Sequence, residues 1–255
     1  MTTWRLVLEY DGEGTCGWQR QPDRVSLQEH VEDAVAHVLG LDHRIAVIAS
    51  GRTDAGVHAL GQVCSFRTTV ERSADNLFSG MNSHLPDHIA VLEARPVQAA
   101  FHAQRSATGK LYRYIIRQGP GKSALRRGRH WSVRWPLDVE AMRVALQALV
   151  GAHDFTSFRA SGCSANSPVR RVDRADLRAV GDELWFELYG NGFLRHMVRN
   201  IVGSALEVGR GRQPVGWMAE LRDARDRRLG GRTAPGCGLY MVRVDYPAAL
   251  LSPPG

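Results

Sequence analysis

Apolar and polar residues alternate in several short stretches of the chain, and each such stretch predicts a β-strand. A helix is expected over 26–40, where apolar side chains recur at helical spacing, Ser26 and Glu29 form a capping-box pattern and Gly40 ends the segment. The other elements expected in the first hundred residues are strands over 4–12, 44–50, 62–68 and 88–97 and a helix over 73–82. This β-α-β-β-α-β order is typical of a ferredoxin-like α+β sandwich, an order shared with RNA-recognition modules.

The rest of the chain repeats the α+β theme. Its expected elements are a strand over 110–118, a helix over 138–151 capped by Asp138, a hairpin turning at 181–182, a helix over 193–209 and a strand over 238–246. We therefore predict an α+β protein with two domains, an N-terminal one over 1–105 and a C-terminal one over 106–255.

Charge separates the same two parts. The 255 residues carry a net charge of +7, but residues 1–105 hold 9 basic and 13 acidic side chains, whereas the remainder holds 24 basic and 13 acidic ones. All but two of the cations are arginine, whose planar fork suits phosphates and stacks on bases. This asymmetry indicates a polyanionic partner, most simply nucleic acid, that is bound largely by the second part.

Other classes of protein find little support in the composition. No stretch reaches the apolar length of a membrane span, and the first residues lack a signal-peptide core, so a cytoplasmic protein is expected. The four cysteines are scattered without a CxxC pair, which gives no indication of a zinc site or a disulfide framework. The stretch GPGKS at 119–123 lacks the first glycine of a phosphate-binding P-loop, because Ile116 stands at that position.

The stretch SGRTDAGVHALGQV at 50–63 places charged residues and glycines between two apolar runs. It is expected to bend as a turn, and it can also present the Asp54 carboxylate at a strand end for chemistry. His58, four residues on, is expected to be packed and hydrogen-bonded, since two ligands without a third do not make a metal site.

Three features of the second part allow a structural and an RNA-binding interpretation. Tyr112 and Tyr114 share one face of a strand, either in the core or with one ring stacked on a base. Arginines alternate with aromatic residues over 126–135, as a solvated face or as an RNA contact. In the helix expected over 193–209, Arg195 and Arg199, like His196 and Asn200, lie four residues apart. They form either a solvent-facing stripe, as expected for Arg195, or, for Arg199 in particular, a pair with a partly buried carboxylate.

Taken together, the motifs closely resemble those of the tRNA pseudouridine synthase A family. The carrying stretches are YDG…GWQRQP (10–22), SGRTDAGVHALGQV (50–63), FHAQRSATGKLYRYII (101–116), HDFTSFRASGC (153–163), SPVRRV (167–172), NGFLRHMVRNIVG (191–203) and TAPGCGLYMVRV (233–244). They follow the family's order and span nearly the whole chain, and GRTDAGVHA is highly specific to it. One departure is Cys16, where members commonly carry an aromatic residue.

The resemblance implies a pseudouridine-synthase fold, with two ferredoxin-like halves, mainly antiparallel sheets and a catalytic cleft between them. It implies that Asp54 is the essential nucleophile, that Tyr112 stacks on the target uracil and that Arg52 fills the space of the flipped nucleotide. Arg199 would form the ion pair that orients Asp54. The implied reaction converts uridines 38, 39 and 40 of the tRNA anticodon arm to pseudouridine, in a homodimer that uses no cofactor or metal.

Elementary chemistry agrees with this implication. The target base must leave the helical stack before its glycosidic bond can be rearranged, and a carboxylate can then attack C1′, add to C6 or support a glycal route. The sequence leaves these routes open. If the protein only bound RNA, Asp54 would have no role, and the sequence contains no RNP1-like run. A glycoside-type hydrolase would need a second carboxylate near Asp54.

Overall fold

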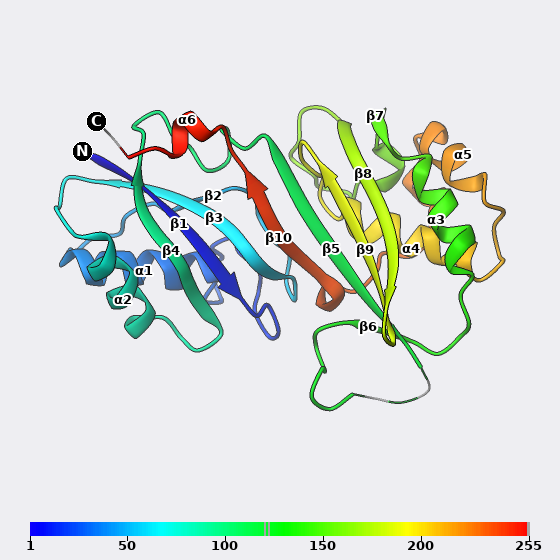
Figure 1. The fold of residues 1–255 in the computed structure, drawn as a ribbon, viewed down its shortest axis with the longest axis horizontal. Helices are drawn as coiled ribbons and strands as arrows, with labels where there is room; N and C mark the ends of the chain where they lie inside the picture. Colours follow the sequence, from blue (N-terminus) through cyan, green and yellow to red (C-terminus); the bar gives the residue numbers. More distant parts are fainter. Residues whose placement is uncertain (120, 122, 254–255) are drawn as a thin grey trace. The chain divides into compact units, whose positions relative to one another are not determined.

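The computed structural model describes residues 1–119, 121 and 123–253 (Figure 1). Pro120 and Lys122, within the GPGKS stretch that lacks the first glycine of a P-loop, lie outside the described residues. The chain forms two compact units. The first comprises Met1–Thr108 together with the chain from Met241 onward, and the second comprises Gly109–Tyr240.

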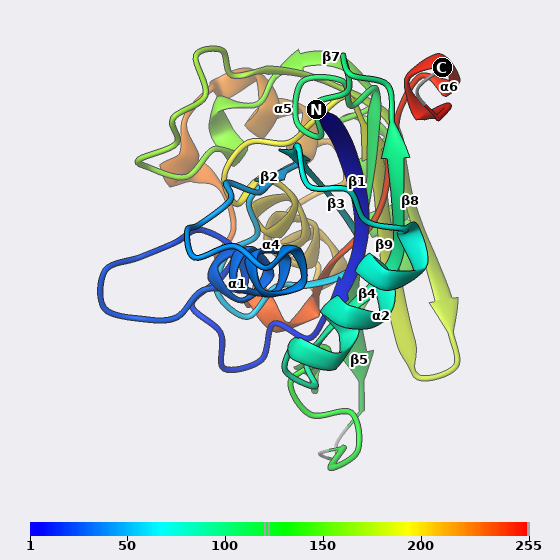
Figure 2. The same cartoon turned by 90° about the vertical axis from the view of Figure 1, so that its left-hand side faces the viewer.

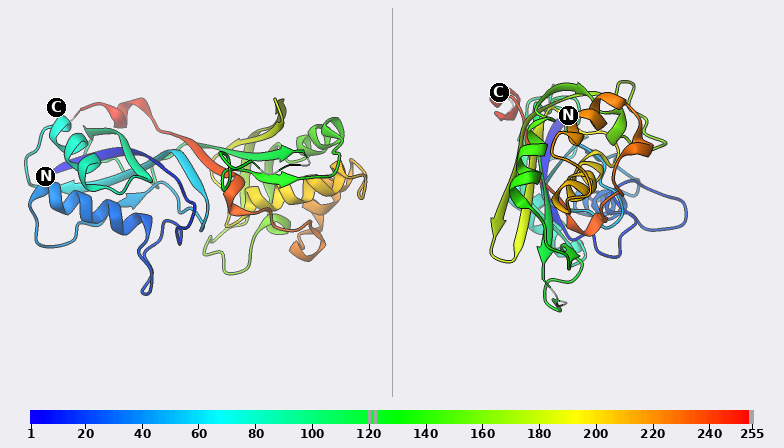
Figure 3. Two further views of the ribbon diagram at one scale, coloured as in Figure 1. Left: turned by 90° about the horizontal axis from the view of Figure 1, so that it is seen from below. Right: turned by 90° about the vertical axis from the view of Figure 1, so that its right-hand side faces the viewer.

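The first unit is an antiparallel sheet with helices. Its elements are β1 (Thr2–Tyr10), α1 (Leu27–Leu39), β2 (Ile48–Ala49), β3 (His58–Thr68), α2 (Ala74–His84), β4 (Ile89–Val97), most of β10 (Leu239–Asp245) and the short α6 (Ala248–Leu251). The strand order is β4-β1-β3-β10, and β2 also pairs with β3. Helix α1 lies against one face of this sheet (Figures 2 and 3) and packs against α2, which contacts β4.

Local signals account for the start and end of α1. The Ser26 side chain accepts from the amide of Glu29, and the Glu29 side chain accepts from the amide of Ser26, which confirms the predicted capping box. Gly40 ends the helix in the left-handed conformation. A cap of this kind stabilises a helix by about 1 kcal/mol.

The C-terminal strand belongs mainly to the first unit, whereas the sequence placed it in a second domain over 106–255. The amide of Thr108 donates to the Asp245 carbonyl at 2.8 Å, and the Tyr246 hydroxyl donates to the Ala103 carbonyl at 2.7 Å. These bonds join segments that are distant in the chain, so a single boundary near residue 105 does not describe the two units.

The second unit is a sheet with helices and several short elements that the sequence did not predict. Its elements are β5 (Gly109–Gln118), β6 (Trp131–Val133), α3 (Val139–Gln147), β7 (Gly151–Asp154), β8 (Val169–Val180), β9 (Glu183–Gly190), α4 (Met197–Gly209) and α5 (Trp217–Ala224), with 3-10 turns at Thr156–Phe158, Arg227–Leu229 and Gly236–Gly238. The strand order is β5-β9-β8-β7, antiparallel throughout, and β6 runs parallel to β5. Helix α4 lies against one face of the sheet and contacts β5 (Figure 3).

Several predicted elements have wrong boundaries: the strand expected over 62–68 begins at His58, and the helix expected over 138–151 ends at Gln147. The strand expected over 44–50 is reduced to Ile48–Ala49, because the preceding residues form a loop that packs on α1 through hydrogen bonds to Glu32. The helix expected over 193–209 begins only at Met197, because His196 adopts a left-handed backbone conformation with φ 59°. Arg195 and His196 therefore precede the helix and do not share its face with Arg199 and Asn200.

Candidate active site

Asp54 lies in the loop between β2 and β3, within the first unit. Its carbonyl accepts from the amide of Val57 at 3.1 Å, and Gly56 takes the left-handed conformation with φ 75°, so the loop bends immediately after the aspartate. Asp54 is half-buried and Arg52, two residues earlier, is exposed. The predicted turn is confirmed, and it presents both charged side chains from one short loop.

A buried hydrogen-bond network connects this loop to side chains on β1 and β3. Gln62 on β3 is fully buried; its Nε2 donates to the Gly51 carbonyl at 2.8 Å, and its Oε1 accepts from the Ser50 hydroxyl at 2.7 Å. The hydroxyls of Tyr10 and Thr53 share a bond of 2.8 Å, and burial raises the pKa of Tyr10. Because such buried polar groups are costly to leave without partners, the network fixes the loop on both sides of Arg52.

The 10–22 stretch supports the loop from the other side. The amide of Trp18 donates to the Thr53 carbonyl at 3.0 Å. A Cβ at Gly17, whose φ is +93°, would lie 2.8 Å from the Thr53 carbonyl oxygen and 2.9 Å from the amide nitrogen of Ala55. Only glycine fits this close approach of two backbones. The two motifs that flank β1 and β3 therefore form one structure around Asp54.

His58 is packed and hydrogen-bonded, as the sequence predicted. It is 2% exposed, and its Nδ1 lies 2.9 Å from the Asp11 Oδ1 and 3.0 Å from the amide nitrogen of Gly12. These contacts attach the beginning of β3 to the end of β1. No three His, Cys, Asp or Glu side chains gather into a metal-binding group in the described part of the chain.

Tyr112 lies in the second unit, on β5 opposite Leu188 of β9. It is 8% exposed, and its ring meets that of Phe193 edge to face at 5.1 Å between centroids. Tyr114 shares this face but is completely buried, and its hydroxyl donates to the Pro235 carbonyl at 2.8 Å. Of the two tyrosines that the sequence left open, Tyr114 is thus a core residue.

Arg199 lies in the first turn of α4 and is half-buried. Its Nε donates to the Ala234 carbonyl at 2.7 Å. The next residue, Asn200, is fully buried; its Nδ2 donates to the Phe158 carbonyl at 2.8 Å and its Oδ1 accepts from the Thr233 hydroxyl at 2.7 Å. Arg199 and Asn200 therefore bind the TAPG segment at 233–236, a structural role that sequence spacing did not reveal.

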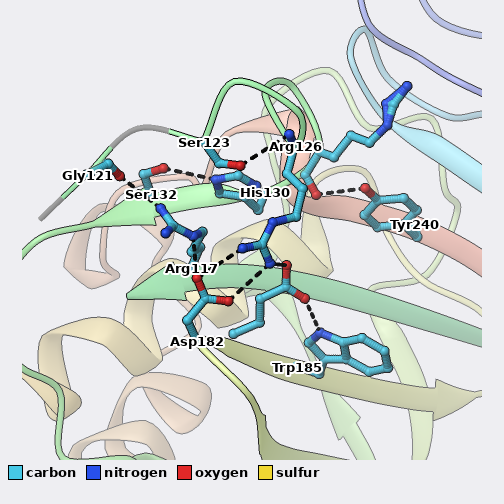
Figure 4. Close-up of polar contacts among 11 residues, drawn as sticks. Arg117, Gly121, Ser123, Arg126, His130, Ser132, Asp182, Trp185 and Tyr240 are labelled. Carbon is cyan, nitrogen blue, oxygen red and sulfur yellow. Dashed lines mark hydrogen bonds and ion pairs between the residues drawn. The ribbon is translucent and has the colours of Figure 1, made fainter. Parts of the chain in front are cut away.

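The arginine-rich loop before β6 is partly neutralised by the β8–β9 turn (Figure 4). Arg126 lies 3.0 Å from carboxylate oxygens of both Asp182 and Glu183, and Arg117 donates to Asp182 at 2.6 Å. The hydrogen bonds from Arg126 and Arg117 lower the pKa of Asp182, and the bond to Asp182 raises that of Arg126. Arg126 is therefore an anchor of the loop.

The other members of the predicted RNA-contact stretch divide between core and surface. His130 and Trp131 are buried, as the structural interpretation of this stretch expected, while Arg127, Arg129 and Arg134 are exposed. The Tyr240 hydroxyl donates to the Arg129 carbonyl at 2.7 Å and fixes the end of the loop (Figure 4). The loop thus offers exposed arginines on a framework held by buried aromatic residues.

The four predicted site residues fall into two pairs. Arg52 and Asp54 share one loop of the first unit, and Tyr112 and Arg199 belong to β5 and α4 of the second.

No helix within the described ranges is long and apolar enough to cross a membrane.

Comparison with known proteins identifies the family. A family model described as tRNA pseudouridine synthase matches residues 6–104 and 145–247. A protein of Acidiphilium cryptum named tRNA pseudouridine synthase A is 48% identical over 96% of this chain and 97% of its own length. Its namesake in Bordetella petrii is 46% identical over 95% of this chain and 90% of its own length. A chain of a solved Cbf5-Nop10-Gar1 complex aligns with 92% of this chain and 57% of its own length, at 12% identity and a TM-score of 0.35 that is too low to establish a shared arrangement.

The chain belongs to the tRNA pseudouridine synthase family. It is an isomerase that converts uridine in tRNA to pseudouridine. The family, the enzyme class and the α+β fold class predicted from the sequence are confirmed.

Proposed function

We propose that the protein isomerises uridines 38, 39 and 40 in the anticodon arm of tRNA, with Asp54 as the essential nucleophile. The observation that supports this most directly is the loop of Asp54. A half-buried carboxylate stands on a turn that Gln62, Tyr10 and Gly17 hold in place, inside the segment that the family model matches. A turn that served only to connect two strands would not need this fixed backbone.

The reaction breaks the bond between C1′ and N1, rotates the uracil and forms a bond between C1′ and C5. The hydrogen leaves C5 as a proton, and N1 gains one. The target nucleotide must first be flipped out of its stem, at a cost of a few kcal/mol. Asp54 then attacks C1′, adds to C6 of the ring or supports a glycal route, and in each case its ionised form acts.

The other three site residues receive distinct roles in this proposal. Arg52 takes the space that the flipped nucleotide leaves, and the ring of Tyr112 stacks on the loose uracil while the base rotates. Arg199 pairs with Asp54 and keeps its carboxylate ionised and oriented. The exposed position of Arg52 and the edge-to-face packing of Tyr112 on Phe193 are compatible with these roles.

The substrate, assembly and compartment follow from the same family. We propose that the protein acts on tRNA as a homodimer in the cytoplasm, without a cofactor or metal. The excess of basic side chains after residue 105 supports binding of a polyanion of this kind.

Tritium release tests the proposal, because pseudouridine formation must displace the hydrogen at uridine C5. With tRNA tritiated at that carbon, the wild type is expected to release tritium and Asp54→Asn to release essentially none. Asp42→Asn, which changes an exposed aspartate of the same unit, serves as the matched control and should behave as the wild type. Release by Asp54→Asn at the normal rate would exclude this nucleophile, and pseudouridine outside positions 38–40 would exclude the proposed target sites.

A further inference from the structure

A group of basic side chains lies on the same face of the second unit's sheet as Tyr112. In the antiparallel register, Lys110 of β5 pairs with Gly190 of β9, and Gly190 pairs with Val172 of β8. Paired residues point to the same face, and residues two apart along a strand share it. Lys110 therefore shares its face with Tyr112, about 7 Å further along β5, and Arg170 shares its face with Val172.

In this register a glycine of β9, Gly190, lies between these two cations. Gly190 has no side chain, and a Cβ at Gly192 would lie 4.0 Å from the Nε of Arg170. Lys110 and Arg170 thus lie on opposite sides of Gly190, on the face that carries Tyr112.

The loop after the Thr156–Phe158 turn carries Arg159 and is contacted by Arg195, which precedes α4. Arg159 donates to the carbonyls of Cys163 and Ala165 at 2.6 and 2.8 Å, and Arg195 donates to the Ser161 carbonyl at 3.2 Å. These bonds fix both guanidinium groups in place but bring no negative charge. These side chains form one group, which we call the 159/170/195 cluster and which consists of Arg159, Arg170 and Arg195 with Lys110 beside them.

The three arginines of the cluster have no acidic partner in the part of the chain that the structure describes. Among the described residues, no carboxylate lies within ion-pair distance of Arg159, Arg170 or Arg195. The other arginines of β8 differ, since Arg171, Arg174 and Arg178 pair with Asp173, Asp176 and Glu187 at 2.8, 3.1 and 3.5 Å. A cluster of held but uncompensated cations attracts an anionic ligand.

The cations of the cluster also act on one another. Burial lowers the pKa of Arg170; the Cys163 thiol opposes this, and the Arg159 charge adds to it. Burial and the charge of Arg170 lower the pKa of Lys110 to about 8. The charge of Arg159 also acts on Asp154. That carboxylate already has other partners, because its Oδ1 accepts from the Thr156 hydroxyl and its Oδ2 lies 3.5 Å from Arg225. A phosphate bound beside Arg170 would relieve its repulsion with Arg159 and Lys110.

We propose that the 159/170/195 cluster binds backbone phosphates of the RNA beside the nucleotide that stacks on Tyr112. This inference rests on the proposed function and extends it, because it assigns the side chains that hold the RNA strand in place while the target base stacks on the ring of Tyr112. Arginine forks suit the paired oxygens of a phosphodiester, and the carbonyl bonds leave their remaining N–H groups for the ligand.

Salt-dependent tRNA binding tests the proposal. The association constant for tRNA, K, is measured by fluorescence anisotropy at several salt concentrations for the wild type, Arg170→Ala, Arg195→Ala and Arg170→Lys. Each alanine variant should bind several-fold more weakly, and the slope of log K against log salt should fall by about one, because one phosphate contact is lost. Arg170→Lys keeps the charge and should recover the slope of the wild type.

Arg174→Ala is the matched control, since it removes an arginine of the same strand that pairs with Asp176. It should retain the affinity and the slope of the wild type. Equal slopes for Arg170→Ala, Arg195→Ala and Arg174→Ala in folded proteins would overturn the inference while tritium release by the wild type stood. A wild type that binds tRNA and releases no tritium would overturn the proposed function alone.

Discussion

The two units hold their charged and polar side chains in opposite ways. Around Asp54, buried side chains of the first unit bond to the loop backbone, so that a single carboxylate is presented by a fixed turn. In the second unit, Arg159, Arg170 and Arg195 bond only to carbonyls and keep their charge uncompensated. The first arrangement suits a group that must meet one atom, and the second suits a partner that brings many negative charges.

This difference predicts which property a substitution in each unit changes. Substitutions in the buried network of the first unit should alter stability or turnover and leave tRNA affinity nearly intact. Substitutions of uncompensated cations in the second unit should alter affinity and its salt dependence.

Glu32 gives the largest expected effect on stability. Its side chain is fully buried on α1, where it accepts from the Val47 amide at 3.1 Å and lies 3.2 Å from the Nη1 of Arg44. Glu32→Ala should lower the free energy of unfolding by about 2–3 kcal/mol, less than for a fully buried pair because Arg44 is half exposed. In urea denaturation, Asp33→Ala at the exposed neighbouring position should change it by less than about 0.5 kcal/mol. Equal effects of the two variants would show that the bonds of Glu32 do not stabilise this unit.

Gln62 tests whether the network serves catalysis. Gln62→Leu removes the bonds to Ser50 and to the Gly51 carbonyl, so the Asp54 loop should lose its fixed position. We expect the rate of tritium release at saturating tRNA to fall about tenfold or more, with unchanged affinity. Gln104→Leu, at an exposed position of the same unit, should have the rate of the wild type. A Gln62→Leu protein with a normal rate would mean that the loop needs no such support.

Arg127 and Arg126 separate a free surface charge from a compensated one. Arg127→Ala should weaken tRNA binding a few-fold and reduce the salt slope by about one. Arg126→Ala should leave the slope nearly unchanged, because Asp182 and Glu183 already neutralise that guanidinium. Binding titrations at several salt concentrations measure both slopes. The opposite order of the two slopes would contradict the assignment of Arg126 as an anchor.

Lys110 gives the smallest expected effect, a dependence of affinity on pH. Burial and the charge of Arg170 lower the pKa of Lys110 to about 8. In the protein without RNA, this side chain is therefore charged below that pH and loses its charge above it. Affinity for tRNA should therefore decrease about two- to fivefold between roughly pH 7 and pH 9. In Lys110→Arg the side chain stays charged, and this part of the decrease should disappear. Identical pH profiles for the two proteins would remove Lys110 from the binding surface.

Much of the fold could be predicted because its signals are local. The caps at Ser26 and Gly40 and the turn at 181–182 depend on neighbouring residues, and the structure confirms them. The early start expected for α4 was wrong, since the left-handed His196 follows from how the chain before the helix packs. The return of the C-terminal strand to the first unit also depends on distant partners.

The site shows the same division. Motifs indicated Asp54, Arg52, Tyr112 and Arg199, but the groups that hold them were not visible in the sequence. Gln62 reaches Gly51 and Tyr10 across 11 and 52 residues, and Arg199 reaches Ala234 across 35. No spacing rule specifies such pairs, because only the folded backbone brings them together. The 159/170/195 cluster was overlooked for the same reason.

One assay of Asp54→Asn tests whether the first unit supplies the reacting carboxylate while the second unit binds the RNA. Affinity for tRNA tritiated at uridine C5 and tritium release are measured on the same protein. We predict an affinity equal to that of the wild type or tighter, since one negative charge near the RNA is removed, and no release above background. Release at a rate near that of the wild type, or a large loss of affinity in a folded protein, would contradict the account.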